Sequence, residues 1–183
     1  MAGGGAGDRA RLLRRFAAVV DAHVEELAEL EVRNSGHTIG NARWEAGNVR
    51  DVLDYYAGAP ERLTGRQIPV PGGLNVTFHE PLGVVGVIVP WNFPMPIAGW
   101  GFAPALAAGN TVVLKPAELT PLTAIRLGEL ALEAGLPPDV LTVLPGRGVW
   151  WARRSSHIRR SGRSASPGRP RWVPGSWPAV PPR

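Results

Sequence analysis

Three short apolar runs separated by helix-length segments restrict the fold of this chain more than any other feature. The runs cover residues 84–89, 110–114 and 140–144. Apolar runs of this length, bounded by glycine or proline, are typical of buried strands in a parallel sheet. Helical patterns occupy residues 96–108 and 121–133 between them. The alternation predicts an α/β fold containing a partial doubly wound, Rossmann-like parallel sheet.

Two amphipathic helices are predicted before this sheet. Residues 8–34 repeat apolar side chains at helical spacing, and residues 42–57 do so again. Asp8 is expected to cap the first helix, and Gly36 is expected to follow its end. Pro60 is expected to prevent the second helix from continuing.

Turn-forming residues predict the remaining boundaries. Residues 67–73 contain two prolines and two glycines and are predicted to be a turn-bearing link. Residues 74–79 alternate apolar and polar side chains and are predicted to be a strand. Thr120 is expected to cap the helix that Pro121 opens.

Charge divides the chain into two parts. Residues 149–183 contain eight arginines and no acidic residue, so residues 1–148 carry 12 basic and 15 acidic residues, a net charge of −3. The later part has no period of 2 or 3.6 residues. We therefore predict a domain over residues 1–148 and a disordered basic tail over residues 149–183. Nucleic-acid or membrane binding by this tail is a less favoured alternative.

Composition excludes several kinds of chemistry. The chain has no cysteine, which excludes a disulfide framework, a thiolate metal site and a cysteine nucleophile. His23, His37 and His79 are interpreted as surface or helix-end residues, and no pair of histidines has ligand spacing, so no metal is expected. The sequence shows neither a signal peptide nor a membrane-spanning run, which predicts a cytoplasmic protein. We expect neither a nucleic-acid partner nor a membrane partner for the domain.

Two motifs follow the first two predicted strands. Residues 90–94 read Pro-Trp-Asn-Phe-Pro, and residues 114–118 read Leu-Lys-Pro-Ala-Glu. Ligands of doubly wound sheets bind outside the carboxyl ends of the strands, where both loops are expected to converge. A Gly-Arg-Gly segment at residues 146–148 follows the third strand in the same way.

These motifs, with further ones at residues 80–86, 104–110 and 135–140, closely resemble the aldehyde dehydrogenase superfamily. The resemblance extends over residues 8–148. In that family, hydride passes from a cysteine-bound thiohemiacetal to NAD(P), and the resulting acyl-enzyme is hydrolysed. The resemblance therefore implies a nicotinamide cofactor and an aldehyde substrate in a complete homologue.

The resemblance also implies roles for particular residues. Asn92 matches the amide that helps to stabilise the oxyanion, although a lone asparagine before Phe-Pro is more often a turn or cap residue. Lys115 and Glu118 match the residues that hydrogen-bond the adenosine ribose. Because a carboxylate repels a 2′-phosphate, NAD is favoured over NADP.

The remaining cofactor contacts are expected from the backbone. Val89, Pro90 and Trp91 are predicted to contribute main-chain groups rather than side-chain chemistry. Gly148 is predicted to belong to a glycine-bearing loop beside the cofactor.

The chain also departs from the family pattern. It lacks the catalytic cysteine, the glutamate that serves as general base and an in-frame Gly-Ser-Thr loop. Without a thiolate no thiohemiacetal forms, so the chain is predicted to be an inactive fragment in which Asn92 is a vestigial oxyanion donor. The alternative is a non-catalytic remnant that binds nucleotide weakly or not at all. An incomplete sheet predicts low stability and aggregation, and a homo-oligomer is expected only for a full-length chain.

The tail is compatible with a shifted reading frame. The codons of Trp150 and Trp151 encode Val-Gly when read two bases out of frame, and those of Trp172 and Val173 encode Gly. The family pattern has glycines at these places. We hypothesise that a small insertion or deletion near Gly148 replaced the family's continuation. Genomic DNA lacking that continuation in either other frame would refute the hypothesis.

Overall fold

The structure is a computed structural model and describes residues 5–147. Gly148 and the predicted tail lie outside the described residues. Three helices come first: α1 (Ala6–Ala22), α2 (Val24–Ser35) and α3 (Ile39–Ala57). A hairpin of β1 (Gln67–Val70) and β2 (Gly73–Val76) follows. The chain then alternates through β3 (Val84–Ile88), α4 (Pro94–Ala107), β4 (Thr111–Lys115), α5 (Leu122–Glu133) and β5 (Leu141–Val143).

The last five elements alternate strand and helix, and their three strands form the predicted parallel sheet. Its strand order is β3-β4-β5, and both neighbouring pairs are parallel. Val84 pairs with Thr111, and Ile88 pairs with Lys115, so β3 and β4 end at the same level. The α/β class and the partial Rossmann-like parallel sheet are confirmed.

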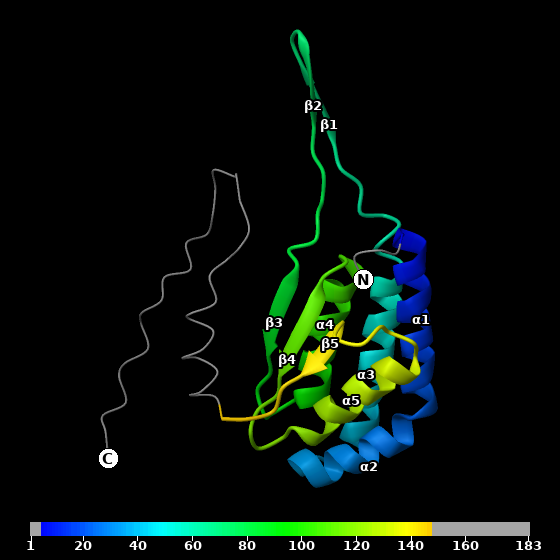
Figure 1. Cartoon of the computed structure of the whole chain (residues 1–183). Helices are drawn as coiled ribbons and strands as arrows, with labels where there is room; N and C mark the ends of the chain where they lie inside the picture. The colour runs from blue at the N-terminus through cyan, green and yellow to red at the C-terminus, as the bar shows by residue number, and fades with distance from the viewer. Residues whose placement is uncertain (1–4, 148–183) are drawn as a thin grey trace, which may run out of the picture.

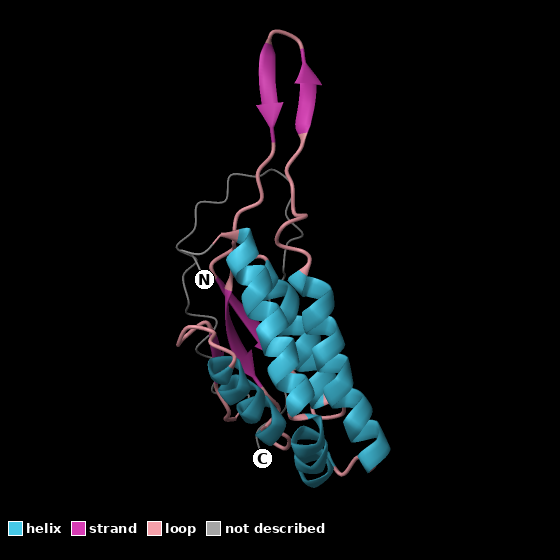
Figure 2. Cartoon of the chain, turned by 90° about the vertical axis from the view of Figure 1, so that its right-hand side faces the viewer, coloured by secondary structure: helices cyan, strands magenta, loops and turns pink. Residues whose placement is uncertain are grey.

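Helices cover one face of this sheet (Figures 1 and 2). The α4 helix packs on β3 and β4, α5 packs on β5, and α1 and α3 form a further layer behind them. The Phe16 and Phe102 rings stack between these layers with centroids 5.7 Å apart, and both side chains are fully buried. The core therefore lies between the sheet and the N-terminal helices.

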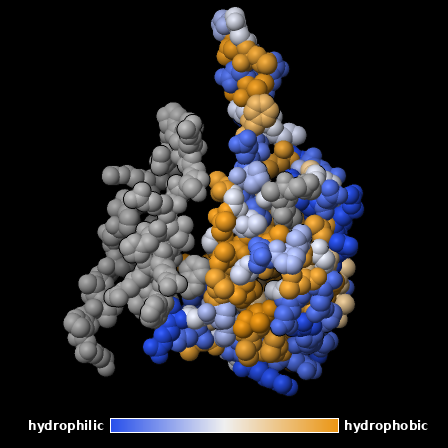
Figure 3. All heavy atoms as spheres, viewed as in Figure 1, coloured by the Kyte–Doolittle hydropathy of each residue, from blue (hydrophilic) through white to orange (hydrophobic). Residues whose placement is uncertain are grey.

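The prediction that the first apolar run is a buried strand was wrong. Residues of β3 alternate between exposed and half-buried, and Val84 and Ile88 are 71% and 72% exposed. The reason is that β3 is an edge strand of a sheet whose helices all pack on one face. Apolar side chains consequently remain at the surface beside β3 (Figure 3).

The predicted first helix is two helices. The break falls at His23, whose backbone leaves the helical region at φ −114° and ψ 18°. The apolar period continues through the break, so local pattern does not reveal it. On the two sides of the break, α1 packs on α3, α4 and α5, whereas α2 packs on α3 and α5.

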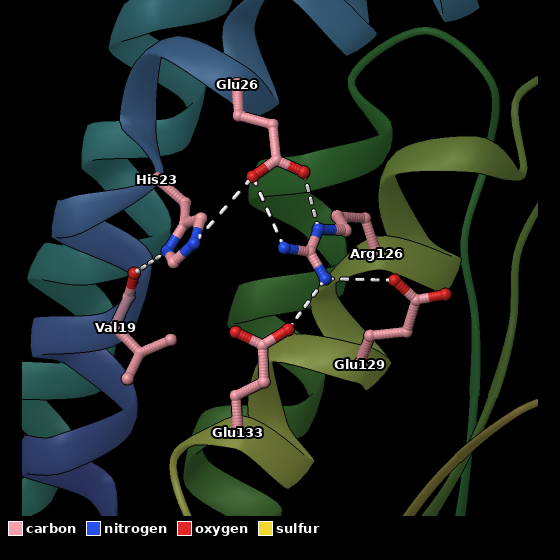
Figure 4. Close-up of polar contacts among 6 residues, drawn as sticks. All are labelled: Val19, His23, Glu26, Arg126, Glu129 and Glu133. Atoms are coloured by element: carbon pink, nitrogen blue, oxygen red, sulfur yellow. Dashed lines mark hydrogen bonds and ion pairs between the residues drawn. The ribbon is translucent and has the colours of Figure 1, made fainter.

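A cluster of charges joins the start of α2 to α5 (Figure 4). The Arg126 guanidinium donates to Glu26 at 2.6 Å and to Glu129 and Glu133 at 3.0 and 2.8 Å. His23 Nδ1 lies 2.8 Å from the Val19 carbonyl oxygen, and its Nε2 lies 3.8 Å from Glu26. This cluster fixes α5 against the helix that begins at the break.

The Arg126 cluster predicts a pH-dependent stability. The hydrogen bond from Arg126 holds the pKa of Glu26 below its usual value of 4.5. A lowered folded-state pKa stabilises the fold above pH 4.5, and this stabilisation disappears as pH falls through the folded-state pKa. Glu26→Gln is therefore expected to cost about 0.5 kcal/mol at pH 7 and less at pH 3, where more of the Glu26 carboxyl group is protonated.

Urea denaturation at the two pH values measures this difference. Glu61→Gln is the matched control, because Glu61 is exposed and forms no ion pair within residues 5–147. An equal effect of Glu26→Gln at both pH values would show that the ion pair does not contribute to stability.

Most predicted helix ends are confirmed within a few residues, but the capping groups differ in part. Gly36 follows α2 in the left-handed conformation at φ 79°, as expected. Asp8 lies inside α1, and its carboxylate accepts a hydrogen bond from the Gly5 amide at 3.0 Å. The Thr38 side chain caps α3 by accepting from the Asn41 amide, which starts this helix three residues earlier than predicted.

Thr120 does not cap α5, contrary to prediction. Its hydroxyl is buried without a hydrogen-bond partner within the described part of the chain. The Leu122 amide at the start of α5 instead donates to Asn34 Oδ1 at 3.1 Å. A residue 88 positions away thus satisfies the helix end, which no local pattern reveals.

Residues 67–70 form a strand rather than the link that was predicted. They pair antiparallel with residues 73–76 through a turn at Pro71-Gly72, and Gly72 has φ 69°. The hairpin projects away from the rest of the molecule, and all eight of its strand residues are exposed. Nothing within residues 5–147 packs against it closely enough to bury a strand residue.

Within residues 5–147, no helix is both long enough and apolar enough to cross a membrane.

Candidate functional site

The loops that carry the sequence motifs begin at one edge of the sheet. The Val89 amide donates to the Lys115 carbonyl at 3.0 Å, directly beyond the Ile88–Lys115 pair. The Leu144 amide donates to the Leu114 carbonyl at 2.9 Å, so β5 ends at the same edge. Three consecutive strands therefore direct their following loops toward one place, where doubly wound proteins bind ligands.

The first loop presents Asn92 to solvent. Val89 is 2% exposed and anchors the loop in the core, whereas Trp91 is 62% exposed. Asn92 is exposed and does not cap α4, since Phe93 is the cap residue and no side chain bonds there. The capping interpretation of Asn92 is thus removed, and its amide is available to a ligand.

Lys115 ends β4 with a buried side chain. It is 5% exposed, and its Nζ donates to the Pro116 carbonyl at 2.7 Å. An ammonium group has three N–H donors. Within the described residues this carbonyl is its one hydrogen-bond acceptor, so donor capacity remains for a ligand hydroxyl.

Glu118 lies three residues further along the same loop. Its side chain is 58% exposed, and the Arg147 Nε lies 3.6 Å from Glu118 Oε1. An exposed ion pair of this kind contributes less than about 1 kcal/mol. The Glu118 carboxylate therefore remains available to accept a hydrogen bond, beside the loop that leads to Gly148.

The structure also brings together three residues that sequence reasoning did not connect. Glu31 of α2, Glu45 of α3 and His37 between the helices each offer one ligand atom, and these atoms all lie within 4.8 Å of one another. His37 Nδ1 bonds to Glu45 Oε1 in a short contact. His37 lies between the end of α2 and the start of α3, in agreement with its interpretation as a helix-end residue, and its side chain is only 21% exposed.

Both carboxylates of this cluster are fully buried. Burial raises the pKa of Glu45, and the neighbouring charge of Glu31 adds to the rise, while the hydrogen bond from His37 opposes it. A signal was present in the sequence: Glu31 lies four residues after Leu27, and Glu45 lies four residues before Val49. Both glutamates therefore occupy core positions of amphipathic helices.

Comparison with known proteins settles which family this arrangement represents. Residues 4–154 match the profile described as "Aldehyde dehydrogenase family". The chain belongs to the aldehyde dehydrogenase family. The match covers most of the chain, and it includes both motif loops at the edge of the sheet.

Individual relatives support the same family assignment. Over 148 residues the chain is 50% identical to a phenylacetaldehyde dehydrogenase of Pseudomonas fluorescens, and the match covers 76% of this chain and 30% of that enzyme. It is 48% identical over 144 residues to a mitochondrial aldehyde dehydrogenase of Arabidopsis thaliana, covering 78% and 27%. The NAD⁺ complex of a Bacillus cereus aldehyde dehydrogenase superposes with a TM-score of 0.79 at 41% identity, covering 81% and 30%.

The chain spans about 30% of the length of these relatives. It corresponds to part of an aldehyde dehydrogenase chain, and the solved relatives include an NAD⁺ complex. The 183 residues contain no cysteine.

Proposed function

We propose that the described residues form the adenosine half of an NAD site and that the chain does not oxidise aldehydes by itself. The observation that carries this proposal is the Ile88–Lys115 register, which aligns the ends of β3 and β4. The buried Lys115 ammonium supplies hydrogen-bond donors to the ribose. The exposed Glu118 carboxylate accepts from its 2′-hydroxyl. Val89, Pro90 and Trp91 would contribute main-chain groups at the same edge, and Gly148, which lies outside the described residues, is proposed as a further contact.

NAD supplies a hydride acceptor when it is bound. In a complete enzyme, the Asn92 amide would donate a hydrogen bond to the oxygen of the aldehyde carbon as negative charge develops on it. Asn92 is exposed and does not cap α4, which fits this task. These 183 residues contain no cysteine thiolate to create that charge. We therefore expect no oxyanion beside the Asn92 amide in this chain.

Lys115 provides a clean test of nucleotide binding, because it is the single lysine of the chain. NAD⁺ is expected to slow acylation of the Lys115 side-chain amine by an N-hydroxysuccinimide ester, measured by mass spectrometry of the Lys115 peptide. Lys115→Met is expected to weaken NAD⁺ affinity by about tenfold or more, because a charged hydrogen bond is lost. Arg33→Met, at an exposed position of α2, is the control and should leave the affinity unchanged.

Two further measurements separate the parts of the proposal. Glu118→Gln is expected to reduce the preference for NAD⁺ over NADP⁺, since repulsion of the 2′-phosphate disappears. Aldehyde-dependent NADH formation by the 183-residue chain is expected to be undetectable. Labelling of Lys115 that NAD⁺ does not slow would indicate a remnant that has lost the nucleotide as well as the reaction.

Further assignments are proposed for the substrate, the oligomeric state, the domain boundary and the cellular location. An aldehyde substrate and a homo-oligomer are proposed for a full-length form, in which the exposed β1–β2 hairpin offers strand edges for assembly. The boundary between domain and tail at residue 148 also remains a proposal. The cytoplasmic location stays a prediction, because the relatives include a mitochondrial and a peroxisomal enzyme.

A further inference from the structure

The cluster of Glu31, His37 and Glu45 contains buried polar atoms that the fold leaves unpaired. Glu31 Oε1 and Glu45 Oε2 have no hydrogen-bond partner within the described residues, although both side chains are 0% exposed. Buried polar atoms are normally paired, because an unpaired one costs its full desolvation free energy. Two such atoms on neighbouring carboxylates therefore have acceptor capacity for a shared ligand.

We propose that Glu31, His37 and Glu45 form a binding site for a divalent transition-metal cation, with Zn²⁺ as the matching ion. Two carboxylates and one imidazole are ligands that Zn²⁺ accepts, with bonds of about 2.0–2.2 Å. The three candidate ligand atoms lie within 4.8 Å of one another, so they reach a shared ion with side-chain shifts of about 1 Å. A divalent ion also balances the charge of two buried carboxylates, which otherwise repel each other.

The surroundings hold the ligands in place. The Asn34 side chain donates to Glu31 Oε2 at 3.3 Å, which orients that carboxylate and leaves Oε1 free. Such hydrogen bonds around a metal ligand fix its geometry. Gly36 in the left-handed conformation reverses the chain after α2, so His37 lies over the helix that carries Glu31. The partial exposure of His37 gives an ion a route from solvent.

The site adjoins the loop that carries Asn92. The His37 and Phe93 rings lie with centroids 5.1 Å apart, and Phe93 directly follows Asn92. An ion that fixes the His37 ring therefore also restricts the ring beside the candidate oxyanion donor. The binding of Zn²⁺ does not depend on NAD, so it can be tested whether or not the chain binds nucleotide.

Titration of the chelator-treated 183-residue chain with ZnCl₂, followed by calorimetry, tests the proposal. One equivalent of Zn²⁺ is expected to bind and to raise Tm by several degrees, because the ion binds only the folded chain. His37→Ala and Glu45→Gln are each expected to weaken binding by about tenfold or more. The control variant His79→Ala/His157→Ala, which removes two histidines outside the cluster, should bind as the parent chain does.

A spectroscopic readout keeps the test decisive if Glu45→Gln fails to fold. Co²⁺ bound to the parent chain is expected to give a visible absorption band that His37→Ala abolishes, and the partly exposed His37 tolerates truncation better than a buried glutamate does. The proposal is overturned if no stoichiometric binding occurs or if binding is lost only in the control variant. It is also overturned if Zn²⁺ leaves Tm unchanged while Glu45→Gln raises it, because the two carboxyl groups would then share a proton.

Discussion

Phe102→Ala is expected to destabilise the chain by about 3–5 kcal/mol, the largest effect of any single substitution considered. Phe102 is fully buried in α4, and its ring stacks on Phe16 of α1 with centroids 5.7 Å apart. Truncation removes apolar contacts from both the sheet layer and the N-terminal helices, and it leaves a cavity between them. Domains are stable by only about 5–15 kcal/mol, so this loss consumes much of the total.

Urea denaturation followed by circular dichroism at 222 nm measures the loss, and Tm is expected to fall by about 10 °C or more. Phe78→Ala is the matched control, because Phe78 lies beyond β2 and is 80% exposed. It should change the free energy of unfolding by less than about 0.5 kcal/mol. Similar losses in the two variants would mean that α1 and α4 do not share a core.

Asn34→Ala is expected to cost about 2–3 kcal/mol, which is large for a partly buried polar residue. The Asn34 side chain donates to Glu31 at 3.3 Å and to Thr123 at 3.2 Å, and it accepts from the Leu122 amide at 3.1 Å. Its removal leaves the buried Glu31 carboxylate without a donor from the described residues and leaves the first amide of α5 uncapped. The polar contact between α2 and α5 then depends on the Arg126 cluster.

Thermal denaturation in the presence of a chelator measures this cost without contribution from a bound cation. Asn75→Ala, at an exposed position of β2, is the matched control and is expected to be nearly neutral. An Asn34→Ala variant as stable as the control would show that water replaces all three hydrogen bonds. Phe102 and Asn34 share no hydrogen-bond or ring partner in the described residues, so their effects are expected to add.

The elements of the sheet were predictable because their signals are local. Strands β3, β4 and β5 each contain a short apolar run with a glycine or proline near its ends, and Pro121 marks the start of α5. The loops at residues 90–94 and 115–118 follow strand ends, and parallel strands carry their ends to one edge. The common location of the candidate NAD residues was therefore predictable from order alone.

The predictions that were wrong concern helix ends and burial, which residues distant in the sequence determine. The break at His23 interrupts an unbroken apolar period, and the cap of α5 comes from Asn34 rather than from the adjacent Thr120. The burial of β3 was overestimated because a continuous apolar run does not show which face the helices cover. Local pattern specifies the type of an element, whereas packing specifies its neighbours.

The family, the strand–helix alternation and the absence of cysteine follow from the amino-acid sequence, because motifs, periodicity and composition are properties of the chain alone. The proximity of Glu31, His37 and Glu45, in contrast, depends on how the helices pack. Their carboxylates and imidazole come from two helices and the turn between them, and the distance between such groups depends on how α2 and α3 pack. That packing is governed by buried contacts far apart in the sequence, which local pattern does not encode.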